Sequence, residues 1–216
     1  MTWKLIEKQK KLLNDERGTI YKDHHGRIKV AIIYPNTYYV GMSNLGFQNI
    51  YYYLNQRDDV VCERAFLPDE EDIDEYKRTE TSLISLESQT RIKDFDIVAF
   101  SVSFENDYIN ILKILGLAGI PYRKTERTEK EPLVIMGGVC AFFNPEPLTD
   151  FIDLIVVGEG EEIINEIIEK YKEEMEKSKR GMLKTMTQIE GCYVPELYGI
   201  NYNEDGTIRA MISKDG

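Results

Sequence analysis

The sequence predicts an α/β fold: a flavodoxin-like, three-layer α/β/α domain with a five-stranded parallel sheet in the order 2-1-3-4-5, preceded by a helix and followed by a β-hairpin tail. Three observations predict it. Five short apolar runs alternate with helical stretches, as βαβ units require. Several of these runs end abruptly in Pro or Gly. The length of 216 residues suits one domain of about 150 residues with appendages.

The strongest strand is residues 28–34, because IKVAIIY is a continuous apolar, β-branched run that Pro35 ends. Such a run is typical of a strand that is buried on both faces. Residues 83–86 are also apolar, but their type stays open. The five predicted strands are residues 28–34, 60–67, 96–103, 133–136 and 153–157.

Helical spacing fills the segments between the strands. Residues 2–14 place apolar side chains among lysines, as in a short amphipathic helix, and the polar residues 15–26 form a linker. Gly119 and Pro121 stop one helix, and a second carries an apolar stripe on one face. The predicted helices are residues 2–14, 44–57, 106–118 and 161–179, with the acidic residues 69–76 as a surface helix or loop.

The tail departs from the βα pattern. Residues 191–195 and the turn at 203–206, flanked by short alternating runs, indicate a small hairpin. The chain ends at Gly216 without a final packed element, so we expect a cut at a domain boundary. The predicted divisions are residues 1–27 for the helix and linker, 28–180 for the α/β domain and 181–216 for a connector.

The charge and the cysteines argue against several classes of function. With 38 acidic against 27 basic side chains the formal net charge is −11, which disfavours nucleic acid and anionic membranes as partners. Cys62, Cys140 and Cys192 lie 78 and 52 residues apart, so they form no motif for zinc or an iron–sulfur cluster. Because the sequence has no apolar leader and no membrane-length apolar run, we expect a cytoplasmic protein with reduced cysteines.

In a doubly wound sheet, ligands bind beyond the carboxyl ends of the strands. The first loop, residues 35–46, is long for a βα connection, which favours a binding role, although a plain turn capped by Asn44 also accounts for it. The glycine pair at 137–138 admits a ligand or another backbone, and the helix dipole alone would favour the glutamates at 159 and 161. The candidate binding residues are Asn36, Thr37, Tyr38, Val40, Gly41, Met42, Ser43, Asn44, Ser101, Ser103, Phe104, Glu105, Gly137, Gly138, Val139, Cys140, Gly158, Glu159, Gly160 and Glu161.

Familiar uses of such a sheet lack their residues here. A phosphoacceptor receiver needs acidic residues after the first and third strands, a flavodoxin needs a Ser/Thr-rich phosphate loop, and a Rossmann enzyme needs GxGxxG. A hydrolase lacks a base, because His24 and His25 precede the first strand in a polar turn and are expected to face solvent. The six acids of residues 69–75 indicate a solvated face rather than a cation site.

The succession of motifs resembles a known family. Five segments carry it in order over residues 28–170: VAIIYPNTYYVGMSNLGFQNIYYYLN, VVCERAFLPD, SLISLES, DIVAFSVSFENDYINILKILGLAGIP and LVIMGGVCAFFNPEPLTDFIDLIVVGEGEE. They resemble the N-terminal cobalamin-binding-type domain of radical SAM proteins, especially an uncharacterised bacterial, Fe–S oxidoreductase-like branch. In that family a partial barrel follows, whose CxxxCxxC motif binds a [4Fe–4S] cluster and S-adenosylmethionine. The resemblance implies an accessory domain that is inactive alone and has the barrel as its intramolecular partner.

The resemblance also implies cobalamin as the candidate cofactor. The DxHxxG motif that supplies a histidine ligand in other cobalamin proteins is missing, and residues 41–46 stand in its place. The apolar ring surface would be covered by Val40, Met42 and Phe104, and the nucleotide tail would be approached by Ser101, Ser103 and the backbones of Gly137, Gly138, Gly158 and Gly160.

A competing hypothesis is a module that has kept the fold and binds no cofactor. It would dock against the barrel or orient a macromolecular substrate. Bulky side chains in the ligand-side loops motivate it, because they could fill the pocket themselves: Tyr38, Tyr39, Phe142 and Phe143.

Overall fold

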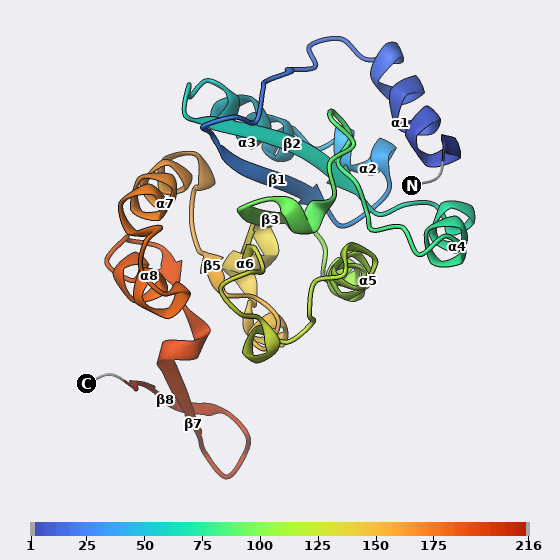
Figure 1. Ribbon diagram of the computed structural model, residues 1–216. Coiled ribbons are helices and arrows are strands. Elements are labelled where there is room, and N and C mark those ends of the chain that lie inside the picture. The colour runs from blue at the N-terminus through green and yellow to red at the C-terminus, as the bar shows by residue number, and fades with distance from the viewer. Residues whose placement is uncertain (1–2, 215–216) are drawn as a thin grey trace.

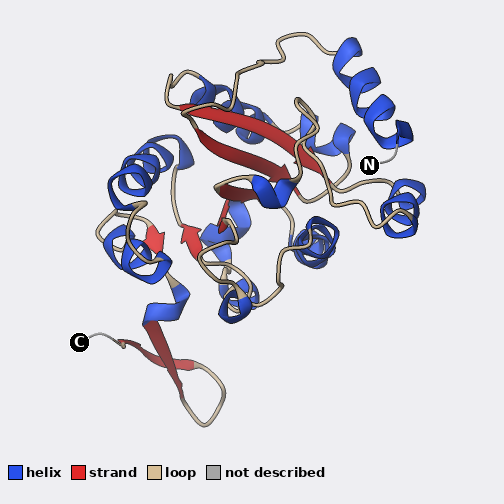
Figure 2. Cartoon of the chain, in the orientation of Figure 1, coloured by secondary structure: helices blue, strands red, loops and turns tan. Residues whose placement is uncertain are grey.

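A six-stranded sheet forms the centre of the molecule, and helices cover both of its faces (Figures 1 and 2). In the computed structural model, which describes residues 3–214, the strand order is β2-β1-β3-β4-β5-β6. The first five strands are parallel, and β6 is antiparallel to β5. The strands are β1 (Ile28–Tyr34), β2 (Val60–Phe66), β3 (Ile97–Ser101), β4 (Leu133–Gly137), β5 (Leu154–Val156) and β6 (Cys192–Tyr193).

The predicted order 2-1-3-4-5 is therefore confirmed for the five parallel strands, whereas the predicted number of strands is wrong. The sixth strand is only two residues long, and Cys192 and Tyr193 pair with Val156 and Ile155 of β5. So short a segment carries no periodicity, and its conformation comes from pairing with a strand about 40 residues earlier.

Several predicted helices differ in their bounds. The helix predicted over residues 44–57 is confirmed as α3, but a separate short helix, α2, lies inside the loop before it. The helix predicted over 161–179 ends at Glu174, and α8 follows, with the Ser178 hydroxyl accepting from the Gly181 amide at 3.2 Å. Thr2, the predicted first residue of α1, lies outside the described residues. The helices are α1 (Trp3–Asp15), α2 (Tyr38–Met42), α3 (Leu45–Asn55), α4 (Glu70–Arg78), α5 (Tyr108–Ala118), α6 (Val139–Phe143), α7 (Gly160–Glu174) and α8 (Lys179–Met186).

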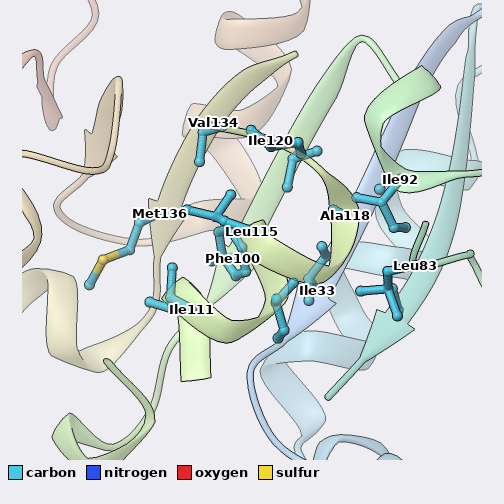
Figure 3. Close-up of a cluster of buried hydrophobic side chains, with 14 of the residues drawn as sticks. Ile33, Leu83, Ile92, Phe100, Ile111, Leu115, Ala118, Ile120, Val134 and Met136 are labelled. Atoms are coloured by element: carbon cyan, nitrogen blue, oxygen red, sulfur yellow. The ribbon is translucent and has the colours of Figure 1, made fainter. Parts of the chain in front are cut away.

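Alternate residues of the central strands enter two separate cores, as the alternation of side chains along a strand requires. Val30 and Ile32 of β1 pack with α3, α7 and α8 on one face. Ala31 and Ile33 pack with α5 and α6 on the other face, where Figure 3 shows Ile33 and Phe100 close to residues of α5. The predicted three-layer arrangement follows from this division, since each face of the sheet has its own helices.

The N-terminal segment lies along the side of the sheet that ends in β2 (Figure 1). Leu5 and Leu13 of α1 are buried, and the Lys8 ammonium pairs with Asp69 at 2.8 Å and with Asp72. The acidic segment at 69–76 thus forms α4 with its preceding turn and provides the partners for a basic helix. Of the predicted linker, residues 15–26, Asp15 still belongs to α1, and residues 16–26 are without helix or strand but bond to the domain at several points.

The predicted hairpin is present as β7 (Tyr198–Tyr202) and β8 (Ile208–Ser213), which pair only with each other and project from the body of the domain (Figure 1). The predicted division at residue 180 stays a prediction, although α8 and β6 pack on the sheet beyond it. Gly216, the predicted cut, lies outside the described residues. Within residues 3–214, no helix has the length and apolar character needed to cross a bilayer.

Candidate functional site

The loops after β1, β3 and β4 bring apolar side chains to the carboxyl edge of the sheet, where they face solvent. Seven of the 17 large apolar residues that are exposed among residues 3–214 lie here, with exposed fractions from 38% at Val40 to 76% at Tyr39. Exposed apolar residues that gather on adjoining loops differ from the singly scattered ones that any protein surface carries. We call this group the rim: Tyr39, Val40, Leu45, Phe104, Val139, Phe142 and Phe143. The prediction that Tyr39, Phe142 and Phe143 fill a pocket is wrong, because all three are exposed.

Beneath the rim, the turns after β3 and β4 touch backbone to backbone. Gly138 has φ +99° and ψ 179°, and a Cβ atom there would lie 2.6 Å from the Val102 carbonyl oxygen and 2.9 Å from its nitrogen. The Val102 amide donates to the Gly137 carbonyl at 2.9 Å, and its carbonyl accepts from the Cys140 amide at 3.2 Å. Of the two partners that sequence analysis left open for the glycine pair, the backbone of the β3 turn occupies this position.

Asn44 joins the first loop to the third. Its side-chain oxygen accepts from the Phe47 amide at 2.8 Å, which caps α3 as predicted, and its Nδ2 donates to the Ser103 hydroxyl at 3.1 Å. One side chain therefore ends a helix and also crosses between two strands of the sheet. The predicted candidates Asn44 and Ser103 are brought together by this bond.

A small apolar cavity lies between the sheet and helices α3 and α7, below the same edge. Its volume is about 70 Å³. A cavity that admits benzene has a volume of about 150 Å³, so this one does not hold an aromatic ring without a shift of its walls. Four predicted candidates, Ser101, Gly137, Gly138 and Gly160, belong to its lining, which is completed by Ile32, Ile50, Ala99, Phe100, Ile135, Val156 and Ile164.

A buried polar cluster ties the loops after β1 and β3 to the start of α5. One oxygen of Asp107, a residue that is only 3% exposed, accepts from the side-chain amides of Asn36 at 2.8 Å and Asn110 at 3.2 Å. The Asn110 amide also donates to the Pro35 carbonyl at 3.0 Å. The other oxygen of Asp107 is buried and has no hydrogen-bond partner among residues 3–214.

The inner side of α2 contacts a buried ion pair. The Tyr38 hydroxyl donates to Glu16 at 2.6 Å, and the Arg64 guanidinium donates to the Met42 sulfur at 3.2 Å. Gly41 is packed so closely that a Cβ atom would lie 2.5 Å from the Phe66 ring. The polar atoms of Tyr38 and Met42, both predicted to touch a ligand, are thus occupied inside the protein.

The remaining candidates are spread around the edge. The Ser43 hydroxyl donates to the Val40 carbonyl at 2.7 Å, and Thr37 lines a separate groove of about 810 Å³ beside α4 and α5. Burial raises the pKa of the Cys140 thiol and keeps it protonated. Glu105, Gly158 and Glu159 are exposed, and Glu161 lies in the first turn of α7, where the helix dipole favours a carboxylate.

The histidines lie near the opposite edge of the sheet, because both precede β1. His25 is exposed as predicted, whereas the prediction is wrong for His24, which is half-buried, lies 2.6 Å from Glu63 and contacts the Phe95 ring. Among residues 3–214, no group of three or more His, Cys, Asp or Glu side chains is placed to hold a metal ion.

Sequence reasoning missed the buried charges. Glu63 and Arg64 stand side by side in the otherwise apolar strand β2, which is a usable signal, because charged residues are almost never fully buried without a partner. The partners of Arg64, Glu16 and Glu87, lie 48 and 23 residues away in non-helical segments, so the sequence does not reveal them. Glu63 is held by side chains that are also distant from it in the sequence, namely His24 and the hydroxyls of Ser85 and Ser88. Asp107 offered no signal beyond its place after the third strand.

Comparison with known proteins adds a family to this geometry. Residues 46–195 match the family model described as radical SAM proteins, N-terminal. The chain is also 27% identical over 143 residues to the uncharacterized protein MJ0966 of Methanocaldococcus jannaschii, a match that covers 65% of this chain and 26% of that protein. The chain therefore spans about a quarter of the length of this curated relative. No solved structure matches the chain.

Proposed function

Because the chain belongs to the family of N-terminal domains of radical SAM proteins, we propose that it is the accessory domain of a radical SAM enzyme and that its rim lies against the catalytic domain. In this proposal the catalytic domain holds the [4Fe–4S] cluster and S-adenosylmethionine, and this chain holds the partner surface. The resemblance described above predicts the same assignment of the cluster and S-adenosylmethionine to the catalytic domain and of an accessory role to this chain.

The observation that carries the proposal is the exposed rim. Its residues come from the three segments that follow β1, β3 and β4, yet they gather at the edge where sheets of this topology bind their ligands. Phe142 and Phe143 are 63% and 73% exposed, and burying two such side chains against a partner would contribute several kcal/mol, at roughly 2 kcal/mol each. Such an apolar surface is more stable when it is buried against another protein domain than when it is exposed to water.

Hydrogen exchange tests the docking directly. We expect residues 38–46 and 139–143 to exchange more slowly in the longer protein that carries this domain than in the 216-residue chain, by about tenfold or more. Phe143→Asp is expected to remove this protection. Tyr52→Asp is the matched control, because Tyr52 is 58% exposed on α3 outside the rim. Equal exchange of the two segments in both proteins would rule out the proposed contact.

A corrinoid on the rim is the second candidate, and the exposed apolar side chains of the rim favour it, because the corrin ring presents a broad apolar face. The fit is partial. The apolar face of Val40 and Phe104 suits a flat ring, but no histidine of the described chain lies at this edge, and the 70 Å³ cavity is too small for a buried nucleotide base. A bound corrinoid would supply alkyl-transfer or redox chemistry, and the rim residues would hold and orient it.

Titration of the chain with hydroxocobalamin tests this candidate. We expect co-elution of visible absorbance with the protein if the ring lies on the rim, and loss of that absorbance in Phe104→Ala. Tyr52→Ala serves as the control for removing an exposed aromatic ring elsewhere. A colourless protein at high ligand excess would leave docking without a cofactor as the function of the edge.

A further inference from the structure

We propose that Glu16, a residue of the N-terminal linker, is a positioning residue for α2 and thereby sets the place of Tyr39 and Val40 on the rim. This inference rests on the proposed function of the rim, since it gives the linker a part in shaping that surface. Nothing in the sequence pattern assigns Glu16 a role, because it lies in a polar segment 22 residues before Tyr38.

The Glu16 carboxylate is fully engaged inside the protein. One oxygen accepts from the Tyr38 hydroxyl at 2.6 Å and from Arg64 at 3.2 Å, and the other accepts from Arg64 at 2.7 Å and from the Thr19 hydroxyl at 2.8 Å. Its side chain is 9% exposed. Although burial raises it, the hydrogen bonds from Arg64 and Tyr38 bring the pKa of Glu16 below its ordinary value, so the carboxylate stays charged.

Arg64 extends the contact to the other end of α2. Its guanidinium, on a side chain that is 3% exposed, also bonds Glu87 at 2.6 Å, lies 4.5 Å above the Tyr51 ring and donates to the Met42 sulfur at 3.2 Å. Tyr38 and Met42 are four residues apart and therefore share one side of the helix. Both inward-facing side chains of α2 thus end on the Glu16–Arg64 pair.

The rim depends on this arrangement because α2 has no independent stability. It is five residues long, far below the length at which a helix persists alone in water, so its contacts fix its position. The Tyr38 and Tyr39 rings meet edge to face with centroids 5.1 Å apart, so a displaced Tyr38 displaces the rim residue beside it. Tyr39 and Val40 face outward from the same helix turn.

Hydrogen exchange of the 216-residue chain tests whether Glu16 holds α2 in place or only attaches the linker to the domain. Tyr38→Phe removes the hydroxyl and keeps the ring. We expect the amides of Gly41 and Asn44, which bond within α2 and the turn after it, to exchange about tenfold faster, equal to about 1.4 kcal/mol. Tyr193→Phe is the matched control, because it removes another tyrosine-to-glutamate bond, of 3.2 Å, and should leave these two amides unchanged.

A second variant completes the test. Glu16→Ala is expected to speed exchange of the same amides, and Tyr38→Phe added to it should have no further effect, because Glu16→Ala already removes the acceptor of the Tyr38 hydroxyl. Unchanged exchange at Gly41 and Asn44 in Tyr38→Phe, or full additivity in the double variant, would overturn the proposal. The measurement uses this chain alone, so it can succeed even if the rim does not dock against a catalytic domain, and fail even if the rim does.

Discussion

Gly138→Ala is the substitution that best tests how the candidate site is built. Gly138 combines a backbone conformation that only glycine adopts readily with a close approach to Val102. The added Cβ would meet both the carbonyl oxygen and the nitrogen of Val102 within 3 Å. Relief therefore requires the turns after β3 and β4 to move apart, which strains the bonds of Val102 to Gly137 and Cys140.

Two terms set the magnitude. Holding alanine at φ +99° and ψ 179° costs about 2 kcal/mol, within the range for strained backbone positions. The contacts below 3 Å add about 2 kcal/mol, as overpacking a tight site does. We expect Gly138→Ala to lower the free energy of unfolding by roughly 4 kcal/mol and the melting temperature by roughly 8–16 °C.

Urea unfolding of Gly138→Ala and Gly119→Ala, measured side by side, isolates the cost of the close contact between Gly138 and Val102. Gly119 also has a positive φ, +70°, at the end of α5, but a Cβ there meets nothing within 4 Å. The control should therefore lose only about 1 kcal/mol. If the two variants unfold within about 1 kcal/mol of each other, the contact between the two turns does not hold the edge together, and the reasoning fails.

Three further predictions concern the same edge and the cysteines. Asn44→Ala should lower the free energy of unfolding by about 1–2 kcal/mol, whereas Ser103→Ala keeps the cap and removes only the hydroxyl that Asn44 reaches; a free energy of unfolding unchanged by Ser103→Ala would deny that bond any role, and equal losses in the two variants would deny the cap one. Asp107→Ala removes the oxygen that accepts two side-chain amides and should lower the free energy of unfolding by about 1–3 kcal/mol, whereas Asp107→Asn keeps that oxygen and should lose less; equal losses in urea unfolding would deny those two bonds any role. Burial raises the pKa of Cys192 to about 12. Because the thiolate fraction falls tenfold for each pH unit below the pKa, alkylation of the native thiol at pH 8 should be about 1000-fold slower than at a free cysteine with a pKa near 9, and its rate should rise with pH. Rapid labelling of Cys192 in the native protein would contradict this prediction.

The sequence predicts the sheet well because its strands are strongly patterned. In β1, residues 30–34 are apolar on both faces, and this pattern is typical of a parallel strand that helices cover on both sides. The elements that sequence reasoning missed are short or depend on distant partners. The strand β6 exists through two pairs with β5, and α2 exists through contacts with Glu16, Arg64 and Phe66.

The sequence predicts where the site lies better than it predicts what each side chain does there. The loops at 35–46, 101–105 and 137–140 do lie at one edge, and Asn44, Ser103 and the glycine pair contact or line a common region there. Tyr38 and Met42, both predicted to touch a ligand, instead lie on the inner side of α2. A five-residue helix has too few residues for its pattern to show which side is buried. Asp107 was missed because a buried carboxylate is specified by its neighbours in space and not by its neighbours in sequence.

The reversed direction of β6 bears on the proposed docking of the rim, because it sets where the chain leaves the sheet. The five parallel strands run toward the rim, so an antiparallel β6 carries the chain away from it, and the hairpin β7–β8 begins on the far side of the sheet. The seven residues of β1 span about 23 Å at roughly 3.3 Å per residue, and a partner attached through the hairpin would have to return over about that height to reach the rim. The reach and stiffness of such a tether would set the local concentration of the partner at the rim, so shortening it by a few residues could separate the two surfaces without altering either one.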